Sequence, residues 1–276
     1  MDHFQSTKSH IKLVLFDLDG TFLNDRKQVL DSSIQALEFL KEKGIRAAFA
    51  TGRDIELVDD LVIKNFKLDH LIDYVIADNG AKIKDCSSDK AISRYFLQVD
   101  QLLKIKDHFK DLKLVYGVGE KGYYFVSGEN ALTRYTNDVL GLPVKVVDFD
   151  SYLTEPKPKF LLFVPSSKQM EKVMDLYQSL DLEGVVGIRS SKNLFEFNHK
   201  NVNKARAIAD LCDYIGIGEE ETMAFGDEMN DLAMLKSAGV SVAMGNASDE
   251  LKAQADFVTD DNNNHGIAKF IYNYFQ

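Results

Sequence analysis

Two aspartates separated by one residue, Asp17 and Asp19, directly follow the nearly uninterrupted apolar run 11–16 and precede Gly20-Thr21. Such a run, rich in branched residues, is typical of a strand buried on both faces of a parallel sheet. Two carboxylates held at the end of a buried strand repel each other unless a cation or a shared proton compensates. A hard divalent cation is the simplest compensation, and Mg²⁺ is the usual one beside phosphate. Taken alone, the pair also fits a surface turn with two solvated acids.

Polar residues follow other predicted strands in the same way. The strand ends carry Asp17 and Asp19, Thr51-Gly52, Asn79-Gly80, and Gly226-Asp227 with Asn230-Asp231. Parallel strands share one carboxyl edge, so these groups are expected to converge, and Lys204 begins a helix in the same part of the chain. This set of residues suits phosphoryl transfer. It contains acids that could bind a cation, a hydroxyl and an amide that could bind phosphate oxygens, and a lysine.

The order of the predicted elements indicates two domains. Strands at 11–16, 46–50 and 74–77 alternate with helices that begin near Asp31 and Asp54, which is the signature of a parallel α/β sheet. The alternation stops near residue 83, where short paired strands and helices take over, and it resumes near residue 203. We therefore predict a core domain formed by 1–84 and 200–276, with an α+β domain, 85–199, inserted into it.

One motif inside the insertion matches the spacing of a dinucleotide-binding loop. Gly117-x-Gly119-x-x-Gly122 has the required glycines but precedes a predicted strand at 123–127 instead of a helix. We therefore interpret it as a hairpin turn.

With these residues in place, the chain resembles the haloacid dehalogenase-like hydrolases, in particular the Cof-type sugar phosphatases with a C2B cap. The four motifs of that family are matched in order by Asp17-x-Asp19-Gly20-Thr21, Thr51-Gly52-Arg53, Lys204, and Gly226-Asp227-x-x-Asn230-Asp231. Asn79-Gly80-Ala81, Ala243-Met244-x-Asn246-Ala247 and Gly266 match further family-typical positions. The resemblance implies an α/β fold with a Rossmann-like parallel-sheet core and an inserted α+β cap that determines substrate specificity.

The resemblance also implies a role for each matched residue. Asp17 would be the nucleophile, Asp19 the general acid and base, and Lys204 the group that neutralises charge on Asp17 and the phosphoryl group. Mg²⁺ would be bound by Asp17, the backbone carbonyl of Asp19 and Asp227, with Asp231 beside it. Phosphate oxygens would be held by Thr51, Asn230, Lys204 and the backbone of Leu18 and Gly52.

The chain departs from the family pattern just before the lysine. Asn201-Val202-Asn203-Lys204-Ala205 stands where the family has Gly-Val-Ser-Lys-Gly. Asparagine tolerates left-handed backbone conformations, so we expect the turn to survive.

Composition limits the partners. The net charge of −10 argues against nucleic acid and against an anionic membrane surface. No run approaches the ~18 apolar residues of a membrane span. The cysteines, Cys86 and Cys212, form no metal or disulfide pattern. We expect a cytoplasmic monomer or dimer that acts on a small phosphorylated metabolite.

Two other functions compete with a phosphatase. A phosphomannomutase-like phosphosugar mutase shares the twin aspartates and a similar cap, but it needs sugar contacts that the sequence does not reveal. A phosphometabolite sensor with a degenerate site would require the loss of a core residue, and Asp17, Asp19, Lys204 and Asp227 are all present.

Overall fold

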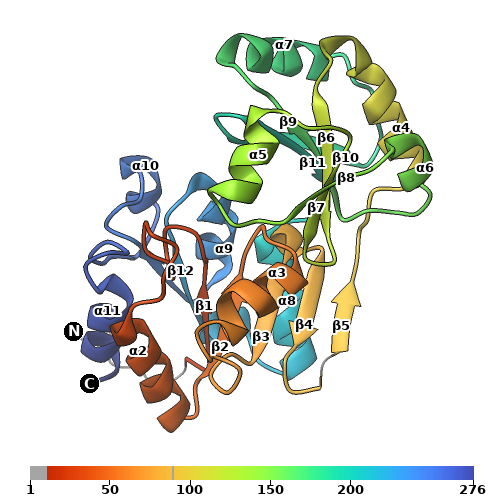
Figure 1. Ribbon diagram of the computed structural model, residues 1–276. Coiled ribbons are helices and arrows are strands. Elements are labelled where there is room, and N and C mark those ends of the chain that lie inside the picture. Colours follow the sequence, from red (N-terminus) through yellow and green to blue (C-terminus); the bar gives the residue numbers. More distant parts are fainter. Residues whose placement is uncertain (1–10, 89) are drawn as a thin grey trace. The chain divides into compact units, whose positions relative to one another are not determined.

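The computed structural model describes residues 11–88 and 90–276 and divides into two compact units (Figure 1). The first unit comprises 11–52, 58–92 and Asn203–Gln276, and the second comprises Arg53–Leu57 and Ser93–Val202. Each unit contains its own sheet.

The sheet of the first unit has β1 (Leu13–Phe16) in its interior. Its strand order is β14 (Phe257–Val258), β13 (Val240–Ala243), β12 (Thr222–Gly226), β1, β2 (Arg46–Ala50), β3 (Tyr74–Ala77), β4 (Lys82–Asp85) and β5 (Lys90–Ser93). Neighbouring strands from β14 to β3 run parallel, and β4 runs antiparallel to β3. The predicted α/β class is confirmed, and every residue of β1 is buried.

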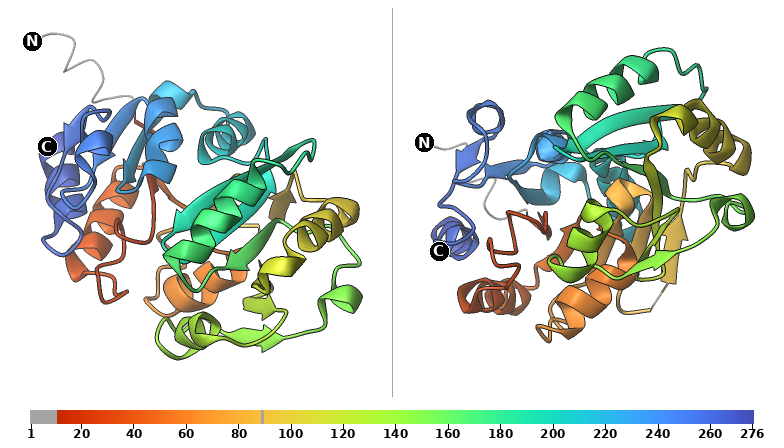
Figure 2. Two further views of the ribbon diagram at one scale, coloured as in Figure 1. Left: turned by 90° about the horizontal axis from the view of Figure 1, so that it is seen from above. Right: turned by 45° about the horizontal axis from the view of Figure 1, so that its top comes forward.

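Helices pack on both faces of this sheet. On one face α8 (Lys204–Ile215) and α9 (Leu232–Ser237) pack on alternate residues such as Leu13 and Leu15. On the other face Phe16 stacks on Phe225, which contacts Phe270 of α11 (Gly266–Phe275). Helix α11 lies alongside α2 (Asp31–Glu42), as Figure 2 shows. The short α10 (Asp249–Lys252) follows β13. The helix α3 (Ile55–Val58), of which Ile55–Leu57 belong to the second unit, continues as a π-helix, η1 (Asp59–Lys64), of the first unit.

The second unit is an α+β module. Its sheet has the order β10 (Val185–Ser191), β11 (Leu194–His199), β9 (Lys159–Phe163), β6 (Val115–Glu120), β7 (Tyr123–Val126) and β8 (Val144–Val146). Helices α4 (Val99–His108) and α7 (Ser167–Tyr177) cover one face, where alternate residues including Phe160 and Phe197 form the core. Leu132 of α5 (Ala131–Asp138) packs with Leu161 and Phe163 of the other face. The module also contains α6 (Phe149–Tyr152).

The glycine motif in the second unit is only partly a turn. Gly117 and Gly119 lie within β6, so their prediction as turn residues is wrong, whereas Gly122 has φ +75° between β6 and β7. A Cβ at Gly117 would lie 2.6 Å from Cε2 of Phe163. Gly117 therefore lets an aromatic ring pack directly on the strand.

Within the ranges that the structure describes, none of the helices combines the length and apolar character that a membrane crossing requires.

Candidate active site

Asp17 directly follows β1, and its side chain is buried. Its backbone N–H donates to the carbonyl of Phe225 at 3.0 Å, and its carbonyl accepts from the N–H of Phe22 at 3.1 Å. The backbone at Asp17 is therefore tied to the neighbouring strand β12 and to the turn that follows. A rigid backbone on both sides of the residue gives its carboxylate a defined direction.

Lys204 forms two buried ion pairs. Its Nζ lies 2.6 Å from Oδ1 of Asp17 and 2.6 Å from Oδ1 of Asp231. Burial alone lowers the pKa of Lys204, but Asp17 and Asp231 raise it above its ordinary value. The ammonium group therefore stays charged at neutral pH.

Asn203 places Lys204 at the first position of α8. Its side chain caps the helix by accepting from the backbone N–H of Arg206 at 2.8 Å. The expected turn before the lysine is present, and the N–H of Val202 donates to the carbonyl of His199 at 2.8 Å. It does not use a left-handed asparagine, because Asn203 has φ −158° and Asn201 is not among the described residues with positive φ. The asparagine that replaces the family's serine acts here as a helix cap.

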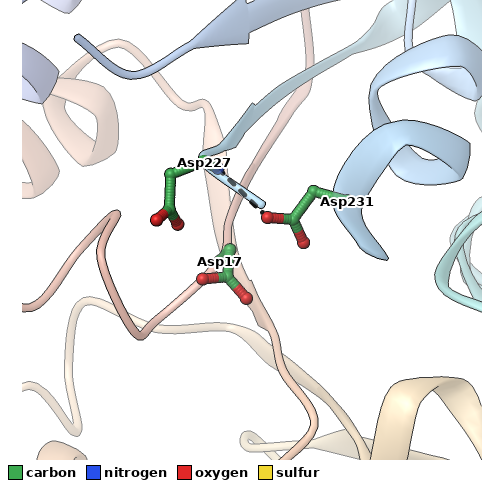
Figure 3. A group of neighbouring side chains, drawn as sticks. All are labelled: Asp17, Asp227 and Asp231. Carbon is green, nitrogen blue, oxygen red and sulfur yellow. Dashed lines mark hydrogen bonds between the residues drawn. The ribbon is translucent and has the colours of Figure 1, made fainter. Parts of the chain in front are cut away.

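Three carboxylates gather beside Lys204 (Figure 3). Asp17, Asp227 and Asp231 each offer an oxygen within 4.8 Å of the others, and all three side chains are buried. Burial, followed by the charge of Asp231, raises the pKa of Asp17 well above its ordinary value. Burial likewise raises the pKa of Asp227 to about 7. Three buried carboxylates beside one ammonium group form an environment in which the charged carboxylates are poorly solvated, and a divalent cation would stabilise them.

Asp227 is oriented by residues from two other loops. The hydroxyl of Thr21 donates to its Oδ1 at 2.8 Å, and Nδ2 of Asn246 donates to its Oδ2 at 3.2 Å and to the carbonyl of Gly20 at 2.8 Å. Gly20 has φ +94°, and a Cβ there would lie 2.2 Å from Oδ2 of Asp227. Only glycine fits this approach. The sequence had indicated Asn246 solely as a family-typical position, without a contact that would define its role.

Asp231 uses both of its carboxylate oxygens within the protein. Oδ2 accepts from the backbone N–H groups of Asp227 at 3.1 Å and Glu228 at 3.2 Å, while Oδ1 pairs with Lys204. Asp231 therefore joins the turn after β12 to the lysine of α8.

Asp19 lies on the more exposed side of the same turn. Its Oδ1 accepts from Nζ of Lys27 at 2.8 Å. Between the two aspartates, the carbonyl of Leu18 accepts from the N–H of Leu23 at 2.8 Å.

The other residues expected to hold phosphate follow the two strands that pair with β1, namely β2 and β12. Thr51 and Gly52 follow β2, which pairs with β1, so they follow the strand beside the one that carries Asp17. Asn230 is an exposed residue in the short 3₁₀ turn η5 (Met229–Asp231), next to Asp231 in the chain. The predicted convergence of strand ends is consistent with this strand order.

A buried carboxylate cluster with a paired lysine at the carboxyl end of a parallel sheet is the kind of site used by α/β enzymes for phosphoryl chemistry. A family model for haloacid dehalogenase-like hydrolases matches residues 14–271, and the chain belongs to this family. The predicted family is confirmed.

Named relatives extend the comparison. The Bacillus subtilis 5-amino-6-(5-phospho-D-ribitylamino)uracil phosphatase YcsE is 31% identical over 266 residues, covering 95% of this chain and 94% of that protein. Phosphatase YwpJ of the same organism is 28% identical over 295 residues, covering 94% of this chain and 98% of that protein.

Solved structures give the same result. A haloacid dehalogenase-like hydrolase from Bacteroides thetaiotaomicron has a TM-score of 0.87 at 26% identity, covering 96% of this chain and 100% of that one. The HAD subclass IIB sugar phosphatase BT4131 has a TM-score of 0.83 at 25% identity, and the match covers 95% of this chain and 98% of that one. The chain is a phosphatase of the haloacid dehalogenase-like type.

Proposed function

We propose that this phosphatase is Mg²⁺-dependent and hydrolyses small phosphorylated metabolites, with sugar phosphates as the favoured class, through an aspartyl-phosphate on Asp17. The buried Asp17 carboxylate, paired with Lys204 and close to Asp227 and Asp231, is the observation that carries the proposal. The names of YcsE, a phosphatase of a phosphoribityl compound, and of the sugar phosphatase BT4131 favour this substrate class.

The carboxylate cluster fits a divalent cation. We assign the Asp17 and Asp227 carboxylates and the backbone carbonyl of Asp19 as its protein ligands. Asp231 lies beside these ligands, where its Oδ1 pairs with Lys204 and its Oδ2 accepts from the backbone of the turn after β12, so it supports the site through those contacts. When bound, Mg²⁺ would act as a Lewis acid that reduces repulsion between the Asp17 carboxylate and the phosphate dianion.

The protein residues then divide the reaction into two displacements. Asp17 attacks phosphorus, the bond from phosphorus to the leaving oxygen breaks, and Asp19 gives that oxygen a proton. Asp19 next takes a proton from water, whose oxygen attacks the aspartyl-phosphate, releasing inorganic phosphate and regenerating Asp17. Lys204, Thr51, Asn230 and the backbone N–H groups of Leu18 and Gly52 hold the phosphoryl oxygens, which concentrates positive charge where negative charge develops.

A panel of phosphorylated metabolites assayed for phosphate release with Mg²⁺ tests the function directly. We expect release from several sugar phosphates. The mutase alternative predicts that a hexose 1-phosphate is converted to the 6-phosphate with little free phosphate. The absence of phosphate release from the whole panel and from aryl phosphates would contradict the proposal.

Metal removal is expected to abolish phosphate release, and added Mg²⁺ is expected to restore it. Ca²⁺ should inhibit, because its larger and looser coordination disturbs in-line geometry.

Asn246→Ala should weaken Mg²⁺ binding by roughly 10-fold, in the range found for residues that orient metal ligands. Isothermal titration measures that affinity without turnover. Asn264→Ala, at an exposed asparagine, is the control, and full activity in excess chelator would contradict the metal site.

Asp19→Asn is expected to affect substrates according to their leaving group. A sugar alkoxide needs a proton, whereas an aryl phosphate leaves as a stabilised phenolate. The loss of kcat should therefore be greater with a sugar phosphate than with p-nitrophenyl phosphate. Equal losses on both substrates would mean that Asp19 does not act as a general acid.

We further propose that the second unit is a cap that determines specificity. Lys159 pairs with Asn198 across β9 and β11, and Leu161 pairs with Glu196, so Lys159, Glu196 and Asn198 share one face of the sheet. All three are buried, and Oδ1 of Asn198 has no hydrogen-bond partner among the described residues. A buried amide oxygen that lacks a donor is unfavourable. A substrate hydroxyl would supply the missing donor if substrate binding uncovers this oxygen.

Asn198→Ala is accordingly expected to raise KM for the preferred sugar phosphate by roughly 10-fold, in line with the loss of one hydrogen bond of about 1–2 kcal/mol. The kcat/KM for acetyl phosphate should stay within about twofold, since that substrate has no hydroxyl to donate. Asn193→Ala in the same hairpin is the control, because the amide of Asn193 already donates to the carbonyl of Val164. Unchanged preference among sugar phosphates in Asn198→Ala would refute the assignment.

A further inference from the structure

The turn after β3 has an unusual backbone. Asp78, Asn79 and Gly80 have φ values of +51°, +58° and +109° in succession. Non-glycine residues rarely adopt positive φ, and strained conformations of this kind persist only where the surrounding structure imposes them. The contacts of the turn Asp78–Gly80 therefore indicate what the strain is used for.

On one side the turn contacts the loop after β2. The backbone N–H of Asn79 donates to the carbonyl of Thr51 at 3.0 Å, and the N–H of Thr51 donates to the carbonyl of Ile76 at 2.8 Å. Oδ1 of Asn79 lies 3.0 Å from the position that a Cβ on Gly52 would occupy. The Asn79 amide therefore packs directly on the backbone of Gly52.

On its other side the turn contacts the start of α8. A Cβ on Gly80 would lie 2.6 Å from the carbonyl oxygen of Asn203 and 3.0 Å from Cβ of Ala207. Asn203 immediately precedes Lys204, and its carbonyl accepts the N–H of Ala207 at 3.2 Å in the first turn of the helix. Any displacement of the backbone at Asn203 would therefore move the residue that carries the catalytic ammonium group.

A buried ion pair anchors the turn. Oδ2 of Asp78 lies 3.1 Å from Nζ of Lys82 in β4, and the Asp78 side chain is wholly buried. Lys82 belongs to a strand that pairs with β3, so the turn is held at both ends by the sheet.

We infer that the turn Asp78–Gly80 is a positioning element that sets the spacing between the Gly52 backbone and Lys204. Asn79 positions the Gly52 backbone and Gly80 positions Lys204, and neither Asn79 nor Gly80 is a catalytic residue. The inference rests on the proposed function only for the phosphoryl contacts of Gly52 and Lys204.

Gly80→Ala tests the contact with α8. The added Cβ meets a backbone oxygen, which cannot move aside as a side chain does, so Lys204 should shift. A displacement of about 1 Å in a catalytic group reduces turnover by roughly 10²-fold. We expect a loss of that size in kcat for p-nitrophenyl phosphate, with a parallel rise in the inhibition constant of orthovanadate, which imitates the five-coordinate phosphorus of the transition state.

Gly216→Ala is the matched control. Gly216 ends the same helix with φ +71°, and nothing lies within 4 Å of its Cβ position. The control has the same kind of backbone strain in α8 without the collision. Equal losses of kcat in the two variants would overturn the inference.

Asn79→Gly keeps the test decisive if Gly80→Ala does not fold. Glycine adopts positive φ readily, so the substitution relieves strain while removing the amide beside Gly52, and the melting temperature should change by less than about 4 °C. The inference requires a loss of kcat despite this preserved stability. Full kcat and an unchanged vanadate constant in Asn79→Gly would overturn it.

Hydrogen exchange separates this inference from the proposed function. If the wild-type protein releases no phosphate from any substrate, the proposed function fails, and amide exchange decides the inference. We expect Gly80→Ala, but not Gly216→Ala, to accelerate exchange at 205–207, and Asn79→Gly to accelerate it at Thr51. Unchanged exchange at both places would overturn the inference.

Discussion

Asp17→Asn is expected to reduce phosphate release by at least ~10³-fold, as removal of a covalent nucleophile does. Asparagine keeps the size and shape of the side chain but cannot form the phosphoenzyme. The measurement is kcat with p-nitrophenyl phosphate and Mg²⁺. Asp175→Asn, at an exposed position in α7, is the control. Turnover near the wild-type value would refute the aspartyl-phosphate mechanism.

The same variant should be at least as stable as the wild-type protein in metal-free buffer, because the cluster loses one of three buried carboxylates while Lys204 keeps its ion pair with Asp231. Burial raises the pKa of Asp17 well above its ordinary value, so the folded state holds that proton more tightly than the unfolded state does. A carboxyl group of this kind contributes stability below its unfolded pKa of about 3.9, and the contribution is lost as pH rises toward the folded pKa. The amide introduced by the substitution does not titrate. The melting temperature of Asp17→Asn relative to wild type should therefore increase from about pH 4 upward.

Lys204→Met is expected to lower turnover by a similar factor, at least ~10³-fold, because it removes the cation shared by the nucleophile and the phosphoryl group. Its effect on stability should be opposite in sign. Methionine leaves the buried Asp17 and Asp231 carboxylates without the ammonium group that lies 2.6 Å from each. Removing one partner of a buried ion pair destabilises a protein by about 3–5 kcal/mol.

The pH dependence of that destabilisation follows from the lysine. The pKa of Lys204 is raised above its ordinary value, so its stabilising contribution is fully present at neutral pH and is lost only at alkaline pH, as pH rises through the folded pKa. The stability difference between Lys204→Met and wild type should be largest near neutral pH. It should shrink in acid as Asp17, whose pKa is raised by burial, becomes protonated. Thermal unfolding from pH 4 to 8 measures it, with Lys200→Met at the exposed neighbouring lysine as the control. Stability equal to wild type at pH 7 would contradict the ion-pair geometry.

The sequence was sufficient to predict the α/β class of the sheet and to name candidate residues for the site. The apolar strand before Asp17, the alternation of strands and helices, and polar residues at successive strand ends depend on local periodicity and burial, which neighbouring residues report directly. The strand order, with β1 between β12 and β2, is not encoded in that local pattern. The catalytic roles remain predictions that the variants above are designed to test.

The contacts within the site required the tertiary structure. Lys204 joins Asp17, 187 residues away, to Asp231, and Asn246 reaches Asp227 while Asn79 and Gly80 contact two other segments. These contacts depend on side-chain directions and on the close approach of segments that are distant in the chain, and no local pattern encodes them. The same reason explains Gly117. The motif indicated flexible glycines, but only the packing of Phe163 against β6 showed that the strand has no room for a side chain at Gly117.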